Sequence, residues 1–439
     1  MKTLKCTLFI YIAIASALVS CNKEDDFLDG QDSSMQPVIE VSVSGYEPAD
    51  PATRATDNED EFKTTLADND QIGIYAVKNG KVISKNIPYK YEKSAWKKAG
   101  DAAVSIVPGD NVSYFAYYPY RQEMSNKNIT CVSDIITYFE VAADQSTHDL
   151  YTRNDLMTAT GTLSDKTLLF TLNHALALIV VDLKGQRTPY VGGYAAYGAV
   201  SAISRKTIGT VTTPYQDAKG CFRALVKQGT VTPDIAYTAN GKTVTYSKAI
   251  TAVAGKYSKK LIYAGNTTNT EKTISRGDYF YADGNISSNN TNDSSNPCIG
   301  IVLTTTECLE VAPYNHGLVV ALKNVTENIR YTWMFWGAIS NIPSAPNTCK
   351  NWFLPSDEQL KLMIWGNTST QSLDGKKFLE GKMNGVANSE NFDARGEGVF
   401  YSATTADYYN NQWAINIKNG QRMKWNNGSG ANARGILAF

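Results

Sequence analysis

Short segments in which apolar and polar side chains alternate recur along the chain, and they constrain its fold more than any other feature. The clearest runs from Pro37 to Gly45, where Ile39, Val41 and Val43 share one face of an extended chain. Only a β-strand places every second side chain on the same face, so this segment is predicted to be a half-buried strand. Similar strand-like segments, separated by turn residues, follow at Gln71–Val77, Val112–Tyr120 and Leu168–Leu183.

Two local details strengthen the prediction of a mostly β fold. Asn79-Gly80 directly follows the second strand, and this dipeptide is typical of a type I′ hairpin turn. The segment Leu168–Leu183 begins as an alternating pattern and then becomes apolar on both faces, as a central strand of a β-sandwich does. Short strands with turn signals between them favour β-sandwich domains.

The length of 439 residues gives room for about three domains. We expect a flexible linker over 21–36, a first β-sandwich over 37–185, a second over 186–275 and a different module over 276–439. The last region is set apart by its composition and by a helix predicted after Ser356, with Gln359 completing a capping box and Gly366 ending it. Six of the seven tryptophans lie there: Trp333, Trp336, Trp352, Trp365, Trp413 and Trp425.

The first twenty residues have the pattern of an export signal. Lys2 and Lys5 precede an apolar run of about twelve residues, too short to span a bilayer, which takes about twenty. The run ends in Leu18-Val-Ser-Cys21, which resembles a bacterial lipobox and predicts cleavage before Cys21 and its lipidation. We therefore expect an exported lipoprotein of the outer membrane and cell surface, attached to the membrane only through lipid.

Composition excludes several classes of function. The chain has 42 basic and 42 acidic side chains, and removal of Lys2 and Lys5 leaves a net charge of −2, so a nucleic-acid partner is not expected. Three histidines and no C-x-x-C spacing argue against a metal centre or a cofactor. His174, on an apolar strand, is interpreted as a hydrogen-bonded core residue, and the Asn289–Asn296 stretch as a solvated loop rather than a calcium site.

Five cysteines remain after the signal and Cys21. A disulfide among Cys298, Cys308 and Cys349 is compatible with an exported protein, although the spacing assigns no pair.

No catalytic signature of a hydrolase, kinase or dinucleotide-binding enzyme occurs, so we expect no enzyme. The late tryptophans are expected to be mainly core residues, with one or two exposed where they could stack on a ligand. Candidates for that role are Trp413, Trp425 and the neighbouring Asn426.

An ordered set of motifs resembles the fimbrillin family, the subunits of type V pili. The set comprises the lipobox, the first strand and the segments Thr53–Thr56, Asp70–Ala76, Tyr117–Tyr120 and Phe170–Ala177. The resemblance covers about residues 1–270 and implies two transthyretin-like β-sandwich domains and assembly by strand exchange. Arg54, in an exposed loop after the first strand, is then the expected cleavage site, with Ala55 as the new terminus and Ile39, Val41 and Val43 in the exchanged strand.

The C-terminal region is similar to a C-type-lectin-like domain. The similarity rests on Gly277–Gly284, Cys298–Val302, His316–Leu322, Trp352–Ser356 and Tyr401–Thr404. The sugar-binding calcium motif of true C-type lectins is missing, since Trp425-Asn426-Asn427 matches it only in part. The expected ligand is therefore either a glycan or a protein on a host or bacterial surface, and the sequence favours neither of the two.

Three functions follow as hypotheses. The first is a pilus subunit, specifically a tip adhesin, which takes a donor strand from a stalk pilin and carries the ligand-binding module at the end of the pilus. The alternative is a surface-anchored glycan-binding lipoprotein that never enters a pilus. The third is a secreted hydrolase, for which the sequence shows no catalytic set of side chains.

Overall fold

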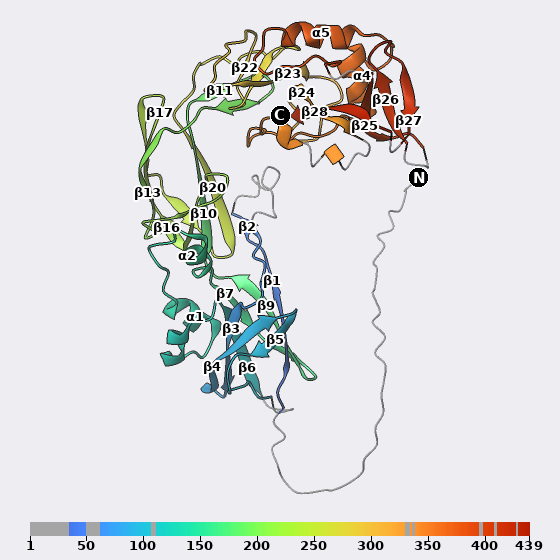
Figure 1. Ribbon diagram of the computed structural model, residues 1–439. Helices are drawn as coiled ribbons and strands as arrows, with labels where there is room; N and C mark the ends of the chain where they lie inside the picture. The colour runs from blue at the N-terminus through green and yellow to red at the C-terminus, as the bar shows by residue number, and fades with distance from the viewer. Residues whose placement is uncertain are drawn as a thin grey trace, which may run out of the picture.

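The computed structural model describes residues 35–49, 62–106, 111–329, 334–335, 339–394, 398–407, 411–426 and 429–439. The fold is mostly β, as predicted. Figure 1 shows the first sheet at the bottom of the view, a second group of strands above it and the C-terminal sheet at the top, with helices α4 and α5 beside that last sheet.

The first sheet has the strand order β1-β9-β7-β6-β3-β4-β5, with β8 paired to β9. Its end strands β1 and β5 also contact one another, so the sheet curls towards closure. Its strands are β1 (Val38–Val43), β3 (Gln71–Lys78), β4 (Lys81–Glu92), β5 (Ala95–Lys98), β6 (Val112–Tyr118), β7 (Met157–Thr160), β8 (Thr162–Ser164) and β9 (Thr167–His174). Short helical segments connect β6 to β7: η3 (Gln122–Asn126), α1 (Val132–Tyr138) and α2 (His148–Thr152).

The predicted hairpin turn between β3 and β4 is confirmed. Asn79 and Gly80 have φ angles of 50° and 72°. A type I′ turn needs a positive φ at both central residues, which asparagine and glycine tolerate better than other residues do. This turn sets the pairing of β3 with β4 at the tip of the sheet.

The second group of strands is built around a five-stranded sheet of order β14-β15-β10-β20-β2. Its strands are β2 (Glu47–Pro48), β10 (Ala177–Lys184), β14 (Tyr215–Gln216), β15 (Phe222–Val226) and β20 (Lys256–Tyr263). Smaller sheets accompany it, formed by β13 (Ala202–Ile208), β17 (Pro233–Ala239) and β18 (Lys242–Tyr246), by β16 (Gly229–Val231) and β19 (Ile250–Ala252), and by β11 (Arg187–Pro189) and β12 (Ala195–Tyr197).

The expectation of one continuous strand over 168–183 is wrong. The run divides into β9 and β10, which belong to different sheets. β9 alternates between buried and exposed residues because it has one solvated face. β10 is buried on both faces because Ile179 and Val181 pack against β13 and β17, whereas Leu178 and Val180 pack towards the first sheet.

The C-terminal sheet has eight strands in the order β22-β21-β23-β24-β28-β25-β26-β27. They are β21 (Tyr279–Tyr281), β22 (Ile286–Ser287), β23 (Cys298–Thr304), β24 (Leu318–Ile329), β25 (Val399–Thr405), β26 (Gln412–Asn416), β27 (Arg422–Trp425) and β28 (Ala431–Ala438). The helical segments of this region are η4 (Ile339–Asn341), α4 (Asp357–Trp365) and α5 (Asp374–Met383).

The predicted helix α4 has both predicted ends. Ser356 and Gln359 form the capping box, and Gly366 adopts the left-handed conformation with a φ of 84°. The second helix, α5, was missed by the sequence reasoning because Gly375 and Gly381 lower its helix propensity. Gly375 is nevertheless required, since a Cβ there would lie 2.4 Å from the backbone nitrogen of Gly366.

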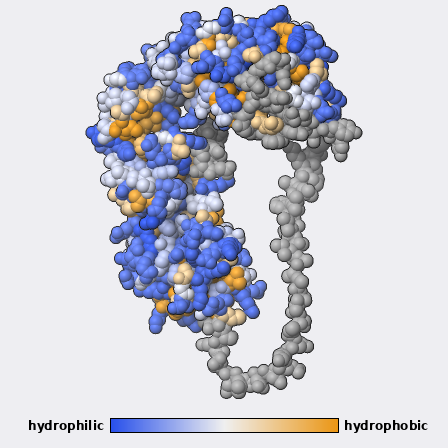
Figure 2. All heavy atoms as spheres, viewed as in Figure 1, coloured by the Kyte–Doolittle hydropathy of each residue, from blue (hydrophilic) through white to orange (hydrophobic). Residues whose placement is uncertain are grey.

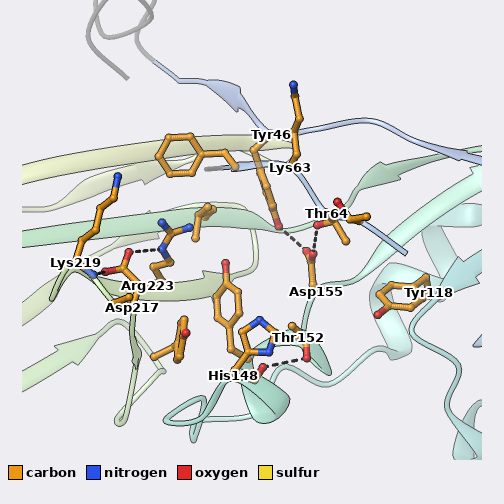
Figure 3. A pocket seen from close by; sticks show the side chains of 16 residues that line it. Tyr46, Lys63, Thr64, Tyr118, His148, Thr152, Asp155, Asp217, Lys219 and Arg223 are labelled. Atoms are coloured by element: carbon orange, nitrogen blue, oxygen red, sulfur yellow. Dashed lines mark hydrogen bonds and ion pairs between the residues drawn. The ribbon is translucent and has the colours of Figure 1, made fainter. Parts of the chain in front are cut away.

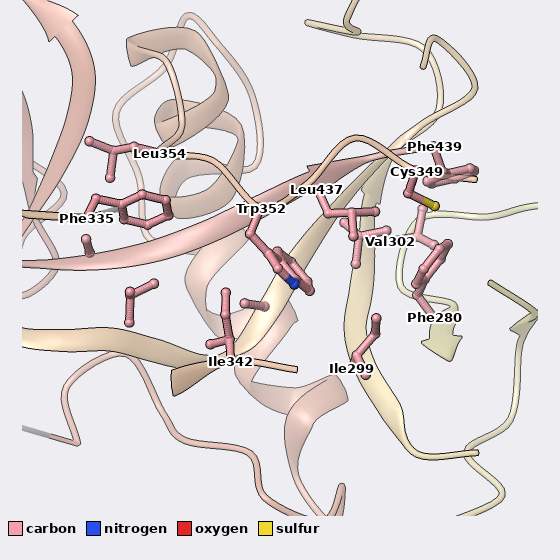
Figure 4. Packing of buried hydrophobic residues seen from close by; sticks show 14 of the residues in the cluster. Phe280, Ile299, Val302, Phe335, Ile342, Cys349, Trp352, Leu354, Leu437 and Phe439 are labelled. Atoms are coloured by element: carbon pink, nitrogen blue, oxygen red, sulfur yellow. The ribbon is translucent and has the colours of Figure 1, made fainter. Parts of the chain in front are cut away.

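Two cores cover the two faces of the C-terminal sheet. Helices α4 and α5 pack on one face. On the other face, Trp352 is 1% exposed and its indole Nε1 donates to the carbonyl oxygen of Pro343 at 2.6 Å. Figure 4 shows Trp352 among Phe280, Phe335 and Leu437. The prediction that late tryptophans are mainly core residues is confirmed for Trp352 and Trp365, and Trp333 and Trp336 lie outside the described residues.

The β11–β12 hairpin contributes to this same core, although in sequence it lies between β10 and β14 of the second sheet. Tyr190 and Tyr194 are both buried in it. The Tyr194 hydroxyl donates to the carbonyl oxygen of Gly284 at 2.8 Å, and its ring lies edge-on to that of Phe439 with centroids 4.8 Å apart. The hairpin therefore joins the middle of the chain to the C-terminal sheet through buried side chains.

The expected disulfide among the late cysteines is not formed. Cys298, Cys308 and Cys349 are free thiols, as are Cys131 and Cys221. Cys298 and Cys349 belong to the cores on opposite faces of the C-terminal sheet, which keeps these two apart.

The face of the molecule in Figure 2 is mainly hydrophilic, with a hydrophobic patch over β13 and β17. Among the described residues, no helix is both long enough and apolar enough to cross a membrane.

Candidate functional site

The first described segment, residues 35–49, is seated on two sheets at once. Strand β1 pairs in parallel with β9 and is the end strand of the first sheet, and β2 pairs in parallel with β20 at the end of the second. Both strands lie side by side with their partners in Figure 1. Because β1 and β2 are each hydrogen-bonded to one strand only, their removal would leave the order of the remaining strands unchanged.

The side chains of β1 alternate as predicted. Ile39 is 5% exposed and packs in the core with Leu168 and Phe170, whereas the adjacent Val38 is 58% exposed. Val41 and Val43 are half-buried and pack against the same core. The predicted set Ile39, Val41 and Val43 is therefore brought together on the inner face of an edge strand.

Tyr46 anchors the segment between β1 and β2. Its backbone nitrogen donates to the carbonyl oxygen of Phe62, and its hydroxyl donates to Asp155 Oδ1 at 2.8 Å. Its ring stacks on that of His174, with centroids 3.7 Å apart and an angle of 20° between the planes. Burial raises the pKa of Tyr46 well above its usual value, and the charge of Asp155 raises it further, so the hydroxyl stays a proton donor.

Asp155 is the acceptor on which this anchor depends. Its Oδ1 also lies 2.9 Å from His174 Nδ1, and its Oδ2 accepts a hydrogen bond from Thr64 at 2.8 Å. The side chain of His174 is fully buried, which agrees with its interpretation as a hydrogen-bonded core histidine. Its second ring nitrogen, Nε2, has no hydrogen-bond partner among the described residues.

A cavity of about 550 Å³ opens beside Tyr46, and its wall is mostly aromatic and basic. Figure 3 shows Tyr46 and Thr64 pointing at Asp155 on one side of the cavity, with the Arg223–Asp217 ion pair on the other. Tyr151 stacks on Tyr215 in the wall, with centroids 5.2 Å apart. Sequence reasoning missed Tyr46 and Asp155 because neither belongs to a pattern of local spacing.

The predicted lipidation and cleavage sites, Cys21 and Arg54–Ala55, lie outside the described residues. The described chain stops at Ala49 and resumes at Phe62, one on each side of Arg54.

The predicted ligand-binding residues of the C-terminal region do not gather on one face. Trp413 is paired with Lys424 and Trp425 with Gln412, so the two tryptophans point to opposite faces of the β26–β27 hairpin. Asn426 is exposed and follows Trp425 directly.

Each of these two tryptophans has its own surroundings. The guanidinium carbon of Arg422 lies 3.2 Å from the ring centroid of Trp413. The same Arg422 forms a bidentate ion pair with Asp357, in which Nε donates to Oδ1 and Nη2 donates to Oδ2, each at 2.9 Å. Trp425 packs against the core, and its Nε1 donates to the carbonyl oxygen of Ser429 at 3.3 Å. No cluster of metal-ligating side chains is found in the ranges that the structure covers.

The sequence profile of the fimbrillin-like family matches residues 53–296, just over half of the chain. The chain belongs to the fimbrillin-like family. Within curated proteins, this fimbrillin-like chain is 30% identical over 291 residues to the Bacteroides ovatus protein named "Putative fimbrium tip subunit Fim1C". That match covers 60% of the chain but only 53% of the relative, so the chain spans about half the length of the relative it matches.

Two of the solved structures that the chain matches are described as fimbrial proteins. A fimbrial protein from Bacteroides ovatus is 20% identical, with a TM-score of 0.40, and the match covers 92% of this chain and 99% of that one. A fimbrial assembly protein from Parabacteroides distasonis is 10% identical, with a TM-score of 0.32, over 54% of this chain and 93% of that one. Both TM-scores are low, so the family assignment rests on the sequence match.

Proposed function

We propose that this protein is a pilus subunit, placed at the pilus tip, that joins its neighbour by exchange of strand β1. A protease cuts between Arg54 and Ala55, the segment that carries Ile39, Val41 and Val43 leaves, and a strand of a stalk pilin takes its place. The observation that carries the proposal is the position of β1, an end strand that is hydrogen-bonded to β9 alone and buries alternate apolar side chains.

The energetics of the vacated groove support exchange. Loss of β1 exposes the apolar side chains of β9 that Ile39 covers and leaves unpaired backbone groups along β9. Full burial of an aliphatic side chain stabilises a protein by about 1.5–3 kcal/mol, so the empty groove costs several kcal/mol. An incoming strand recovers this energy together with the hydrogen bonds of the ladder.

The test is the variant Arg54→Ala, which should fold normally and fail to enter pili. Lys81→Ala, which removes an exposed basic side chain at the β3–β4 turn, serves as the matched control and should assemble normally. Pili purified from cells are probed for the subunit and for residues 37–53. Arg54→Ala protein found at pilus tips with that segment attached would rule out strand exchange by this cut.

Placement at the tip is supported by the likeness to the Bacteroides ovatus relative whose printed name is "Putative fimbrium tip subunit Fim1C", 30% identical over 291 residues. Strand β28 lies between β24 and β25 in the C-terminal sheet, and all eight of its residues are buried, so this strand is an integral part of that sheet. Immunogold labelling of intact pili tests the placement, since a tip subunit gives gold at pilus ends and a stalk subunit gives gold along their length.

The C-terminal region is proposed to be the ligand-binding module, with a C-type-lectin-like fold over 276–439. It follows two transthyretin-like domains proposed over 37–185 and 186–275, and the first of these ranges also supplies β10 (Ala177–Lys184) to the sheet of the second. Its ligand is a glycan or a protein on a host or bacterial surface. Trp413, Trp425 and Asn426 remain the candidate contacts, and the opposite orientation of the tryptophans means that one of them is used at a time. Binding of the purified protein to a glycan array, compared between Trp413→Ala and Trp425→Ala, tells which face is used.

Surface anchoring of the precursor is proposed to depend on Cys21, after removal of residues 1–20. Cys21→Ala should abolish labelling by a fatty-acid analogue and release the protein from the outer membrane. Equal labelling of wild type and Cys21→Ala would end this part of the proposal.

A further inference from the structure

Asp155, Thr64 and His174 form the site that holds the side chain of Tyr46, which is called the Tyr46 seat below. The Tyr46 side chain leaves this seat when β1 leaves. Asp155, Thr64 and His174 all follow the proposed cut in sequence, so they remain in the subunit. Removal of Tyr46 takes away a hydrogen bond to the Asp155 carboxylate and uncovers the ring of His174. A buried carboxylate that loses a donor is costly, so the groove is left incomplete at this point as well as along β9.

We infer that the incoming donor strand must carry a tyrosine that fills this seat, and that Asp155 and His174 select the partner by this residue. The inference rests on the proposed strand exchange. The chain's own segment is the template, because it shows which side chain the seat accepts. A tyrosine side chain supplies both groups that the seat requires, which are a flat ring to stack on His174 and a hydroxyl to donate to Asp155.

The structure also fixes the spacing that the donor needs. Ile39 is opposite Leu168 in β9, and Glu47, next to Tyr46, is opposite Lys256 in β20. A donor that runs in the direction of β1 must therefore place its tyrosine at the seventh position after the residue that replaces Ile39. Apolar residues two and four positions after that residue would take the places of Val41 and Val43.

Other side chains satisfy the seat less well. Phenylalanine would stack on His174 but would leave Asp155 without one of its donors. Loss of a hydrogen bond to a charged group lowers the binding affinity by a factor of roughly 10 to 100. An aliphatic residue would lose the ring contact as well, and the factor rises to about 100 or more.

The experiment uses the full chain with a specific protease site inserted after Arg54, so that the cut does not depend on the natural protease. The cut protein is mixed with an excess of labelled synthetic peptides of residues 35–49, and uptake is followed by fluorescence anisotropy. The peptides carry the natural sequence, Tyr46→Phe or Tyr46→Ala. A fourth peptide, Glu40→Ala, is the matched control because Glu40 is exposed on β1.

The expected order is natural sequence equal to Glu40→Ala, then Tyr46→Phe about 10-fold weaker or more, then Tyr46→Ala about 100-fold weaker. In an Asp155→Asn receptor the ratio between the natural and Tyr46→Phe peptides should shrink, as in a double-mutant cycle. If that receptor does not fold, the peptide series on the wild-type chain decides alone.

Two other outcomes distinguish the tyrosine requirement from strand exchange itself. Equal uptake of all four peptides would overturn the tyrosine requirement and leave strand exchange standing. No uptake of the natural peptide by fully cut protein would overturn both.

Discussion

The variant Ile39→Ala tests how strand β1 is held in the uncut protein. Ile39 is 5% exposed and lies against Leu168 and Phe170, so the truncation removes buried atoms from an edge of the core. Such changes cost about 2–5 kcal/mol, and the lower half of that range applies here because an edge strand can settle into the space. A loss of about 2–3 kcal/mol corresponds to a roughly 30- to 150-fold larger population in which β1 is detached.

Amide hydrogen exchange followed by mass spectrometry measures that population locally. Peptides that cover 35–49 and β9 should exchange about 30- to 150-fold faster in Ile39→Ala, whereas β10 should keep its wild-type rate. Val38→Ala is the matched control, since Val38 is the exposed neighbour on the same strand. Equal acceleration by Val38→Ala, or acceleration of β10 to the same extent, would refute the view that alternate burial holds β1 as a separate unit.

Three further predictions concern the rest of the fold. The free energy of unfolding should fall as the pH rises above about 10. Burial raises the pKa of Tyr46 and raises that of Tyr190 to about 12, so the unfolded chain loses these protons at a lower pH than the folded chain does. A flat stability profile from about pH 9 to 11 would contradict this prediction. Ser356→Ala should destabilise the C-terminal region by about 0.5–2 kcal/mol in a denaturant titration, whereas Ser356→Thr should keep most of the α4 cap. Addition of a reductant should leave the melting temperature unchanged, and a melting temperature that depends on the reductant would reveal a disulfide. A thiol reagent should react only slowly with Cys349 in the native protein, because burial raises the pKa of Cys349 to about 12.

The parts of the fold that the sequence predicts are those that local chemistry determines. The alternation of Ile39, Val41 and Val43, the turn at Asn79-Gly80 and the capping box at Ser356 each depend on residues within a few positions of one another. The apolar run over 168–183 shows the limit of such patterns. Periodicity reports how many faces of a strand are buried but not which sheet buries them, so the division between β9 and β10 could not be read from it.

The candidate site could not be predicted for a related reason. Tyr46 and Asp155 are 109 positions apart, and each is an ordinary residue in its local sequence. Only the seating of one segment on two sheets brings the phenol to the carboxylate. His174 was correctly interpreted as a hydrogen-bonded core residue, because a histidine in an apolar strand needs a buried partner. The partner itself could not be named from the sequence.

The β11–β12 hairpin has a mechanical consequence. In the proposed function, a tip subunit held by its ligand in a flow would be loaded in tension, and domains joined only by a flexible linker would swing or extend at that linker. Here Tyr190 and Tyr194 reach from the middle of the chain into the core beneath the C-terminal sheet. Rotation of that sheet away from the hairpin would have to withdraw both rings and break the hydrogen bond from Tyr194 to Gly284. The joint therefore resists bending, and load on the C-terminal sheet passes through packed side chains as well as through the covalent chain.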